Sequence, residues 1–238
     1  MTVTIDNTST LTHASNQPAN TDLTSAAFTV SASATAVAVR IAQQGIGTLS
    51  ARYDPTGVNT TMTLVGDIGS PGNTSLVGIF AIVNPSVTGS RTVAVQSTST
   101  ADIAFEAQSY LGTVTSSVAN AFKNAGSGAA TSTGPMSSST VGATTSGSLV
   151  IAVHDYAGGG TVNSTSDTQD WIDNTLVNIN SSANHKNASG GTDTLTSAIS
   201  ASQSWASVIC EVVASAGAVV VSTVTMPRRL IMLKMEDQ

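Results

Sequence analysis

The middle of the chain carries the clearest alternation between apolar runs and polar breaks. Residues 76–83 and 102–111 are nearly continuous runs of apolar and β-branched residues, and a shorter run, residues 91–96, lies between them. A turn that contains Pro and Gly separates residues 76–83 from residues 91–96, and a Ser/Thr linker separates residues 91–96 from residues 102–111. Continuous runs of this length are typical of strands that are covered on both faces. We therefore predict three consecutive strands here.

Shorter runs predict further strands on both sides of this block. They are residues 2–6, 27–31, 36–42, 48–53, 60–66, 148–156, 171–179, 192–200 and 204–214. Residues 7–22 and 181–191 are polar and are predicted loops. Residues 113–140 are mostly Ser, Thr, Ala and Gly, which predicts a long surface excursion with one short helix near residues 116–123.

About ten short strands with almost no helical periodicity predict an all-β protein. The expected architecture is a two-sheet antiparallel β-sandwich, jelly-roll-like, formed by residues 1–214 as one domain. Residues 215–238 then form a C-terminal extension, a last strand or a tail that serves as an assembly arm. We find no internal sequence repeat.

Composition narrows the range of functions. Only 9% of the residues are charged and the net charge is −6, so the chain has no basic surface of the kind that nucleic-acid binding requires. No apolar run is long enough to span a membrane, and the N-terminus has no features of a secretory leader. A surface with few charges gives little protection against edge-to-edge strand pairing, which favours a homo-oligomer or an assembly with covered edges. The single cysteine, Cys210, lies in an apolar run and is expected to be a buried, inert thiol.

The C-terminal segment has a character of its own. It places basic and large apolar residues side by side after Pro227, and an apolar patch of this kind marks an interaction site when it is exposed. The alternative is a last element docked on its own domain. The candidate partner-binding residues are Arg228, Arg229, Leu230, Ile231, Met232 and Leu233.

Several short motifs occur in an order that resembles a known module. They are Ile5-Asp6-Asn7, Tyr53…Gly57…Met62-Thr63, Phe80-Ala81-Ile82-Val83-Asn84-Pro85…Gly89, Thr92-Val93-Ala94-Val95, Tyr110-Leu111-Gly112, Gly147-Ser148-Leu149-Val150 and Trp205-Ala206. The chain resembles, over residues 1–214, a β-sandwich module of bacteriophage virion proteins and bacterial secreted proteins. The absence of a recognisable leader and the extra tail favour the phage members. The resemblance implies a virion surface protein, either a head decoration (cement) protein or a fibre component, and it supplies no catalytic residues.

Two further clusters suggest ligands. Trp171 and Tyr156 flank a Gly-rich loop and could form a sugar-stacking platform, whereas Trp205 is expected in the core. Asp167, Asp170 and Asp173 could supply oxygen ligands for Ca²⁺, although solvated loop acids are the simpler interpretation because the loop lacks the Gly and the terminal Glu of an EF-hand. We expect no cofactor.

Candidate catalytic residues are few. Glu106 and Glu211 lie within apolar strands, and two carboxylates at a suitable separation could hydrolyse a glycosidic bond, but strand-face acids more often have structural roles. His154 ends a buried strand, and no Gly-x-Ser-x-Gly motif frames a serine nucleophile. We therefore predict a non-enzymatic virion structural protein, assembled in the host cytoplasm, that binds other capsid or tail subunits. The alternative is an extracellular or cell-surface carbohydrate-binding module that acts through Trp171, Tyr156 and the loop acids.

Overall fold

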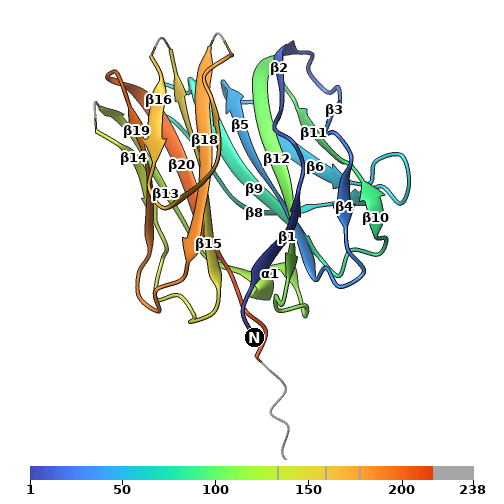
Figure 1. Ribbon diagram of the computed structural model, residues 1–238. Coiled ribbons are helices and arrows are strands. Elements are labelled where there is room, and N and C mark those ends of the chain that lie inside the picture. Colours follow the sequence, from blue (N-terminus) through green and yellow to red (C-terminus); the bar gives the residue numbers. More distant parts are fainter. Residues whose placement is uncertain (133, 159, 177, 217–238) are drawn as a thin grey trace, which may run out of the picture.

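The part of the chain that the structure describes forms five antiparallel sheets and one helical turn (Figure 1). The computed structural model describes residues 1–216 apart from residues 133, 159 and 177. The expectation of an all-β antiparallel sandwich is confirmed. The sheets, however, are more numerous than the two expected from the sequence, because each half of the chain builds a sandwich of its own.

The first half forms a large sheet and a smaller outer layer. The large sheet, called here the first inner sheet, has the order β1-β12-β5-β9-β8, and β2 also pairs with β12. Its strands are β1 (Thr4–Thr8), β2 (Thr12–Gln17), β5 (Ala36–Gln44), β8 (Thr63–Gly69), β9 (Ser75–Val83) and β12 (Ala101–Leu111). The outer layer has the order β3-β11-β6-β7 with a separate β10-β4 pair, comprising β3 (Leu23–Thr24), β4 (Phe28–Val30), β6 (Leu49–Tyr53), β7 (Thr60–Thr61), β10 (Gly89–Arg91) and β11 (Val93–Ser97).

The second half repeats this plan. The second inner sheet has the order β13-β20-β15-β18-β17, and its outer sheet has the order β14-β19-β16. These strands are β13 (Phe122–Ser132), β14 (Met136–Ser139), β15 (Leu149–Ala157), β16 (Val162–Thr165), β17 (Thr168–Asp173), β18 (Ile179–Asn187), β19 (Thr194–Ile199) and β20 (Gln203–Val212). In each inner sheet the first and the last strand of that half of the chain are neighbours, namely β1 with β12 and β13 with β20. The next three strands follow in equivalent orders, β5-β9-β8 in the first sheet and β15-β18-β17 in the second. The two halves therefore share a topology although their sequences show no repeat.

The two inner sheets pack face to face, which gives four layers in total. One apolar core joins them and includes Ala38 and Ile79 from the first sheet with Ile151 and Val208 from the second. Three further apolar clusters lie between the inner sheets and their outer layers, one in the first sandwich and two in the second. We call the contact between the inner sheets the seam. Because the first inner sheet is covered on both faces, β9 and β12 have almost no exposed positions, as their continuous apolar runs predicted.

The helical turn α1 (Val118–Ala121) links the halves and is capped by Ser117, whose hydroxyl accepts a hydrogen bond from the backbone N–H of Asn120. The short predicted helix is thus present, but the predicted surface excursion around it is wrong. Strand β13 forms an edge of the second inner sheet, and it contains Gly126 and Gly128 because the β14 backbone passes very close above it. A Cβ at Gly126 would lie 1.9 Å from the Ser139 carbonyl oxygen.

Two predicted loops are also strands in the structure. Strand β2 lies within residues 7–22 and pairs with β12, and β18 covers most of residues 181–191. Strand β18 is buried along most of its length, but its side chains there are mainly Ser, Ala and Asn. Ser182 and Asn184 hydrogen-bond to Ser197 and Thr196 of the outer strand β19, so burial does not depend on an apolar pattern here.

Candidate functional site

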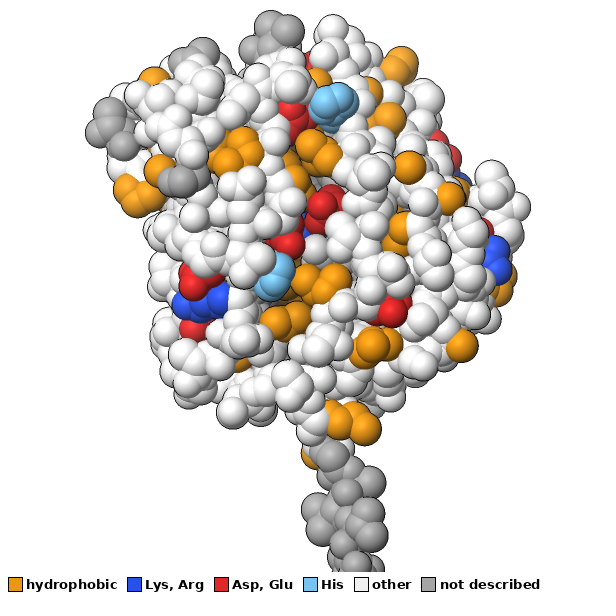
Figure 2. Space-filling view, in the orientation of Figure 1, with side chains coloured by type: hydrophobic (Ala, Val, Ile, Leu, Met, Phe, Trp, Pro, Cys, Tyr) orange, Lys and Arg blue, Asp and Glu red, His pale blue; other side chains and the backbone are white. Residues whose placement is uncertain are grey.

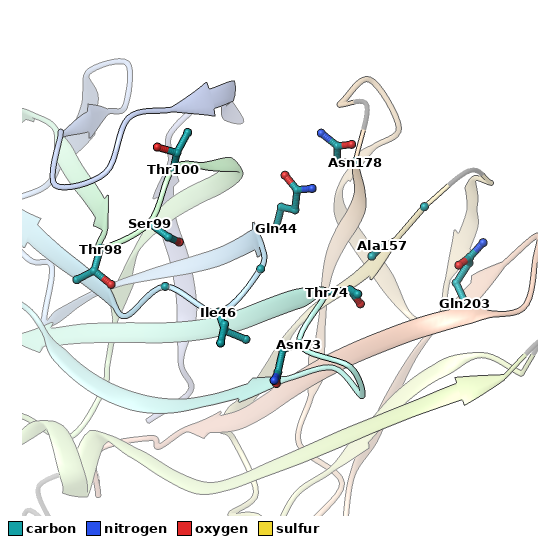
Figure 3. A pocket seen from close by; sticks show the side chains of 13 residues that line it. Gln44, Ile46, Asn73, Thr74, Thr98, Ser99, Thr100, Ala157, Asn178 and Gln203 are labelled. Carbon is teal, nitrogen blue, oxygen red and sulfur yellow. The ribbon is translucent and has the colours of Figure 1, made fainter.

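An open cleft of about 830 Å³ lies at one end of the seam (Figure 3). Loops from both sandwiches form it, at the ends of β5 and β15 and at the starts of β9, β12 and β20. Its volume is in the range of small-molecule binding sites. The lining residues are Gln44, Gly45, Ile46, Gly47, Asn73, Thr74, Thr98, Ser99, Thr100, Ala157, Gly158, Asn178 and Gln203.

The lining is polar but uncharged. Four side-chain amides line it, those of Gln44 at the end of β5, Asn73 before β9, Asn178 before β18 and Gln203 at the start of β20. The remaining polar side-chain groups are hydroxyls of Ser and Thr. Ile46, which is 61% exposed, adds one large apolar side chain. Each amide can donate and accept hydrogen bonds. This cleft therefore offers paired donors and acceptors without a formal charge.

Hydrogen bonds beneath the cleft fix parts of its wall. The buried carboxylate of Asp102 accepts from the Asn178 backbone at 3.3 Å and from its side-chain amide at 3.0 Å, which ties the second sandwich to β12 of the first. The Gln43 amide donates to the Gly47 carbonyl at 3.0 Å, and the Thr98 hydroxyl accepts from the Thr48 backbone at 2.8 Å. By contrast, the Gln44 and Gln203 side chains make no hydrogen bond to any other described residue. These two amides remain available to a ligand.

Deeper in the seam, a charged network connects the two sandwiches. Arg40 on β5 bonds the Asp170 Oδ2 atom on β17 at 2.5 Å and the Glu106 Oε1 atom on β12 at 2.5 Å. The second oxygen of Asp170 accepts from Gln108 at 3.2 Å and lies 2.8 Å from His185 Nδ1. Figure 2 shows acidic and histidine side chains along the seam on the visible face, within a mostly uncharged surface. The network thus fixes the relative position of the two sandwiches whose loops form the cleft.

In this network Arg40 forms ion pairs with two carboxylates, and the pKa values of these carboxylates shift in opposite directions. Burial raises the pKa of Glu106 to about 7, and the attraction of Arg40 offsets this only in part. For Asp170, burial acts to raise the pKa, but Arg40 and the hydrogen bond from His185 outweigh it and hold the pKa well below its usual range. The pKa of Arg40 itself is raised by the two acids against the effect of burial. Asp170 is therefore the permanent counter-ion of Arg40, and Glu106 is the group that changes charge near neutrality.

A second buried chain of hydrogen bonds contains a serine, a histidine and an asparagine. The Ser207 hydroxyl lies 2.8 Å from His154 Nδ1, and His154 Nε2 lies 3.0 Å from the Asn184 Oδ1 atom. All three side chains are 0% exposed, and burial lowers the pKa of His154 to about 4. Because the serine is buried, a substrate could not reach it. The role of these hydrogen bonds is structural: Ser207 also bonds Ser138 on β14, which connects the second inner sheet to its outer sheet.

The structure places the predicted sugar platform in the interior. Trp171 is 5% exposed and packs in the seam core, whereas Tyr156 is 0% exposed and packs with Trp205 on the other face of the sheet. Stacking requires an open ring face. Burial therefore contradicts Trp171 and Tyr156 as a glycan platform, while the core position expected for Trp205 is confirmed.

The three candidate calcium ligands do not form one site. Asp167 is exposed on a tight turn with a φ of 59°, and Asp170 belongs to the Arg40 network. Asp173 is buried and bonds His13 Nδ1 at 2.7 Å. Asp170 and Asp173 both face the first sandwich but contact different residues there, and Asp167 lies in the turn before β17. The described residues contain no group of three or more His, Cys, Asp or Glu side chains that could hold a metal ion.

The two strand glutamates lie in different sheets with separate partners. Glu106 bonds Arg40, whereas the Glu211 carboxylate on β20 accepts from the Asn124 amide at 2.7 Å and from the Thr145 backbone at 2.7 Å. Both are buried, so both have structural roles here. Cys210 is buried as expected, and burial raises the pKa of its thiol to about 12. The tail residues Arg228, Arg229, Leu230, Ile231, Met232 and Leu233 lie outside the described residues.

The cleft itself was missed in the sequence analysis. Some of its amides lie next to apolar runs, as Gln44 does after residues 36–42. No sequence motif, however, indicates that these distant segments come together in the folded protein. Over the part of the chain that the structure describes, no helix is both long and apolar enough for a membrane span. Comparisons with models of known protein families, with curated proteins and with solved structures found no match.

Proposed function

We propose that this protein is a non-enzymatic structural component of a bacteriophage virion, a head decoration or fibre protein that binds other capsid or tail subunits. The proposal rests on the resemblance of residues 1–214 to the phage sandwich module and on the difference between the two ends of the molecule. This difference between the ends is the observation that carries the proposal. One end holds the cleft, and the opposite end holds both the N-terminus and the last described residues (Figure 1).

Several contacts define the end opposite the cleft. The Val3 amide donates to the Gly147 carbonyl at 2.8 Å, and the Ser215 hydroxyl lies 3.2 Å from the Met1 sulfur. Residue 216, the last residue of this part of the chain that the structure describes, therefore lies at this end of the body. A partner bound at this end would leave the cleft pointing away from the partner surface. This arrangement suits a protein that is anchored at one end and displayed at the other.

We also infer a jelly-roll-like connectivity for the first sandwich. Its inner strands β1-β12-β5-β9 face the outer strands β3-β11-β6-β7, and the chain alternates between the two layers in the manner of two Greek keys. Jelly rolls occur in viral capsid proteins and also in lectin domains. The likeness is an analogy at the level of the fold, and it supports a virion role.

The test is co-assembly. Mass spectrometry of purified particles is expected to detect the chain, and the purified protein is expected to cosediment with particles that lack it. Removal of residues 226–238 should abolish cosedimentation while far-UV circular dichroism still reports a folded β protein. A matched control replaces the same residues with an equally long Gly/Ser segment, and this variant should also fail to cosediment with the particles. Cosedimentation of the truncated chain would disprove the role of the tail, and absence from the particles would disprove the virion assignment.

A homo-oligomer is part of the same proposal. Symmetric repetition allows weak contacts between copies to sum, and the sparse surface charge favours association. Analytical ultracentrifugation of the full chain should show a species larger than the 23.8 kDa monomer. A monomer at all accessible concentrations would count against self-association and would leave binding to other subunits to be judged by cosedimentation.

A further inference from the structure

We propose that the cleft at the end of the seam binds a neutral oligosaccharide. The inference goes beyond the virion role, since it concerns the displayed end of the molecule and not the end from which the tail continues. It begins with the chemistry of the lining. None of the 13 residues around the cleft carries a formal charge, and four of them are side-chain amides.

This lining selects against charged ligands. A phosphate, a carboxylate or an amine would lose hydration on entering the cleft without meeting an opposite charge in its wall. A neutral ligand with many hydroxyl groups loses less, because amides and hydroxyls can replace water as both donors and acceptors. Nucleic acid is disfavoured on the same grounds, since its phosphates need Lys or Arg contacts.

The spatial arrangement of the amides fits a ligand with hydroxyls on several sides. Gln44 and Asn73 belong to the first sandwich, whereas Asn178 and Gln203 belong to the second, and Figure 3 shows them on strand ends and loops around the same opening. The Ile46 side chain, 61% exposed at the rim, offers an apolar surface for the C–H face of a sugar ring. A sugar with both a polar edge and an apolar face matches this combination.

A peptide is the main competing ligand, and the cleft suits it less well. Extended peptides are commonly bound by pairing with an exposed strand edge, which satisfies their regularly spaced backbone groups. Here the wall consists of loops and strand ends, and strand β5 ends in a turn at Gly45, whose φ is +76°. The cleft thus presents separate side-chain groups in place of a ladder of backbone groups.

The cleft exists only because the two sandwiches are held in register. Asn178 is fixed by Asp102 across the seam, and the Arg40–Asp170 pair lies deeper in the same contact. Gln203 is placed against Gly158, where a Cβ would lie 3.0 Å from the glutamine side chain. The amides of Gln44 and Gln203, which bond no other described residue, therefore lie on walls from different sandwiches that the Asn178–Asp102 contact ties together.

The experiment uses the full chain and an array of neutral and anionic oligosaccharides, followed by titration calorimetry. The neutral probes are maltoheptaose, cellohexaose and chitohexaose, the anionic probe is a heparin oligosaccharide, and an uncharged Gly/Ser peptide represents the competing class. We expect a neutral oligosaccharide to bind. Gln44→Ala and Gln203→Ala should each weaken binding by about two- to tenfold, the loss expected for one or two hydrogen bonds. Thr100→Trp, at an exposed position of the lining, should abolish binding by filling the cleft.

The control is Asn187→Ala, which removes an exposed amide from the end of β18 that pairs with the start of β15, away from the cleft. It should bind like the unmodified chain, and circular dichroism should show that all variants are folded. The proposal is overturned if no neutral oligosaccharide binds at millimolar concentration, if the cleft variants bind normally, or if the heparin or peptide probe binds more tightly. Cosedimentation with particles is measured separately, so failure here does not affect the assembly proposal.

Discussion

Replacement of Arg40 by methionine is expected to destabilise the protein strongly. Arg40 is 1% exposed and is the only described cation that contacts Glu106 and Asp170, which lie on opposite sides of the seam. Methionine keeps much of the side-chain volume but removes the charge and the hydrogen bonds. The variant therefore leaves two buried carboxylates without their counter-ion.

The size of the effect follows from the burial of the pair. Removal of one partner from a buried ion pair costs about 3 to 5 kcal/mol. Two features of the network keep the effect from doubling. Glu106 can take up a proton, since its pKa is raised to about 7, and Asp170 retains its contacts with Gln108 and His185. We therefore expect a loss of about 3 to 5 kcal/mol in the free energy of unfolding for the whole network.

The matched control is Arg52→Met. The Arg52 side chain pairs with Asp22 near the surface, and the two are 32% and 33% exposed. Surface ion pairs are worth about 0 to 1 kcal/mol, so this variant should change stability little.

Urea unfolding, followed by circular dichroism and by the fluorescence of the buried Trp171 and Trp205, measures both variants. A triple variant, Arg40→Met with Glu106→Gln and Asp170→Asn, should recover much of the loss because no charge remains buried. If Arg40→Met costs no more than Arg52→Met, or if the triple variant is less stable than the single one, the reasoning is refuted.

The remaining predictions concern pH, backbone packing and thiol reactivity. Because the pKa of Glu106 rises from 4.5 to about 7 on folding, the native protein keeps a proton that the unfolded chain releases between these pH values. The free energy of unfolding should therefore fall as pH rises from about 4.5 to about 7, and Glu106→Gln should abolish this pH dependence. The pKa of His154 falls from 6.5 to about 4, so stability should fall as pH drops through this window, and His154→Gln should flatten this limb. Gly126→Ala should cost about 1 to 3 kcal/mol or more by overpacking, because its Cβ would lie 1.9 Å from a backbone oxygen of β14, whereas Gly66→Ala meets ordinary contacts at 3.6 Å. Cys210, buried with a thiol pKa of about 12, should react with a thiol reagent only at the rate of unfolding.

Each of these has a result that contradicts it. The two pH predictions are read as differences between variant and unmodified protein in urea unfolding at a series of pH values, and a constant difference across the window contradicts either one. Equal melting temperatures for Gly126→Ala and Gly66→Ala would show that β14 can move away at no cost. Rapid modification of Cys210 in folded protein would mean that the seam core opens readily.

The local pattern of the sequence was sufficient to predict most strands. Strands β9 and β12 were recognisable because a strand covered on both faces needs apolar residues at nearly every position. The pattern failed at β13 and β18, whose small and polar residues are buried through close backbone packing and hydrogen bonds. Propensity and periodicity report local conformation and the need for burial, but not close packing between layers.

What the sequence alone determined is therefore the class of the protein: antiparallel strands, little helix, few charges and one buried thiol, all of which depend on neighbouring residues or on composition. The tertiary structure decided that the chain folds into two sandwiches, that Arg40 meets Asp170 across 130 positions of sequence, and that loops from both halves enclose the cleft. Such contacts depend on which buried faces pack together. Apolar attraction is non-directional, so a linear pattern shows that a face must be covered without showing what covers it.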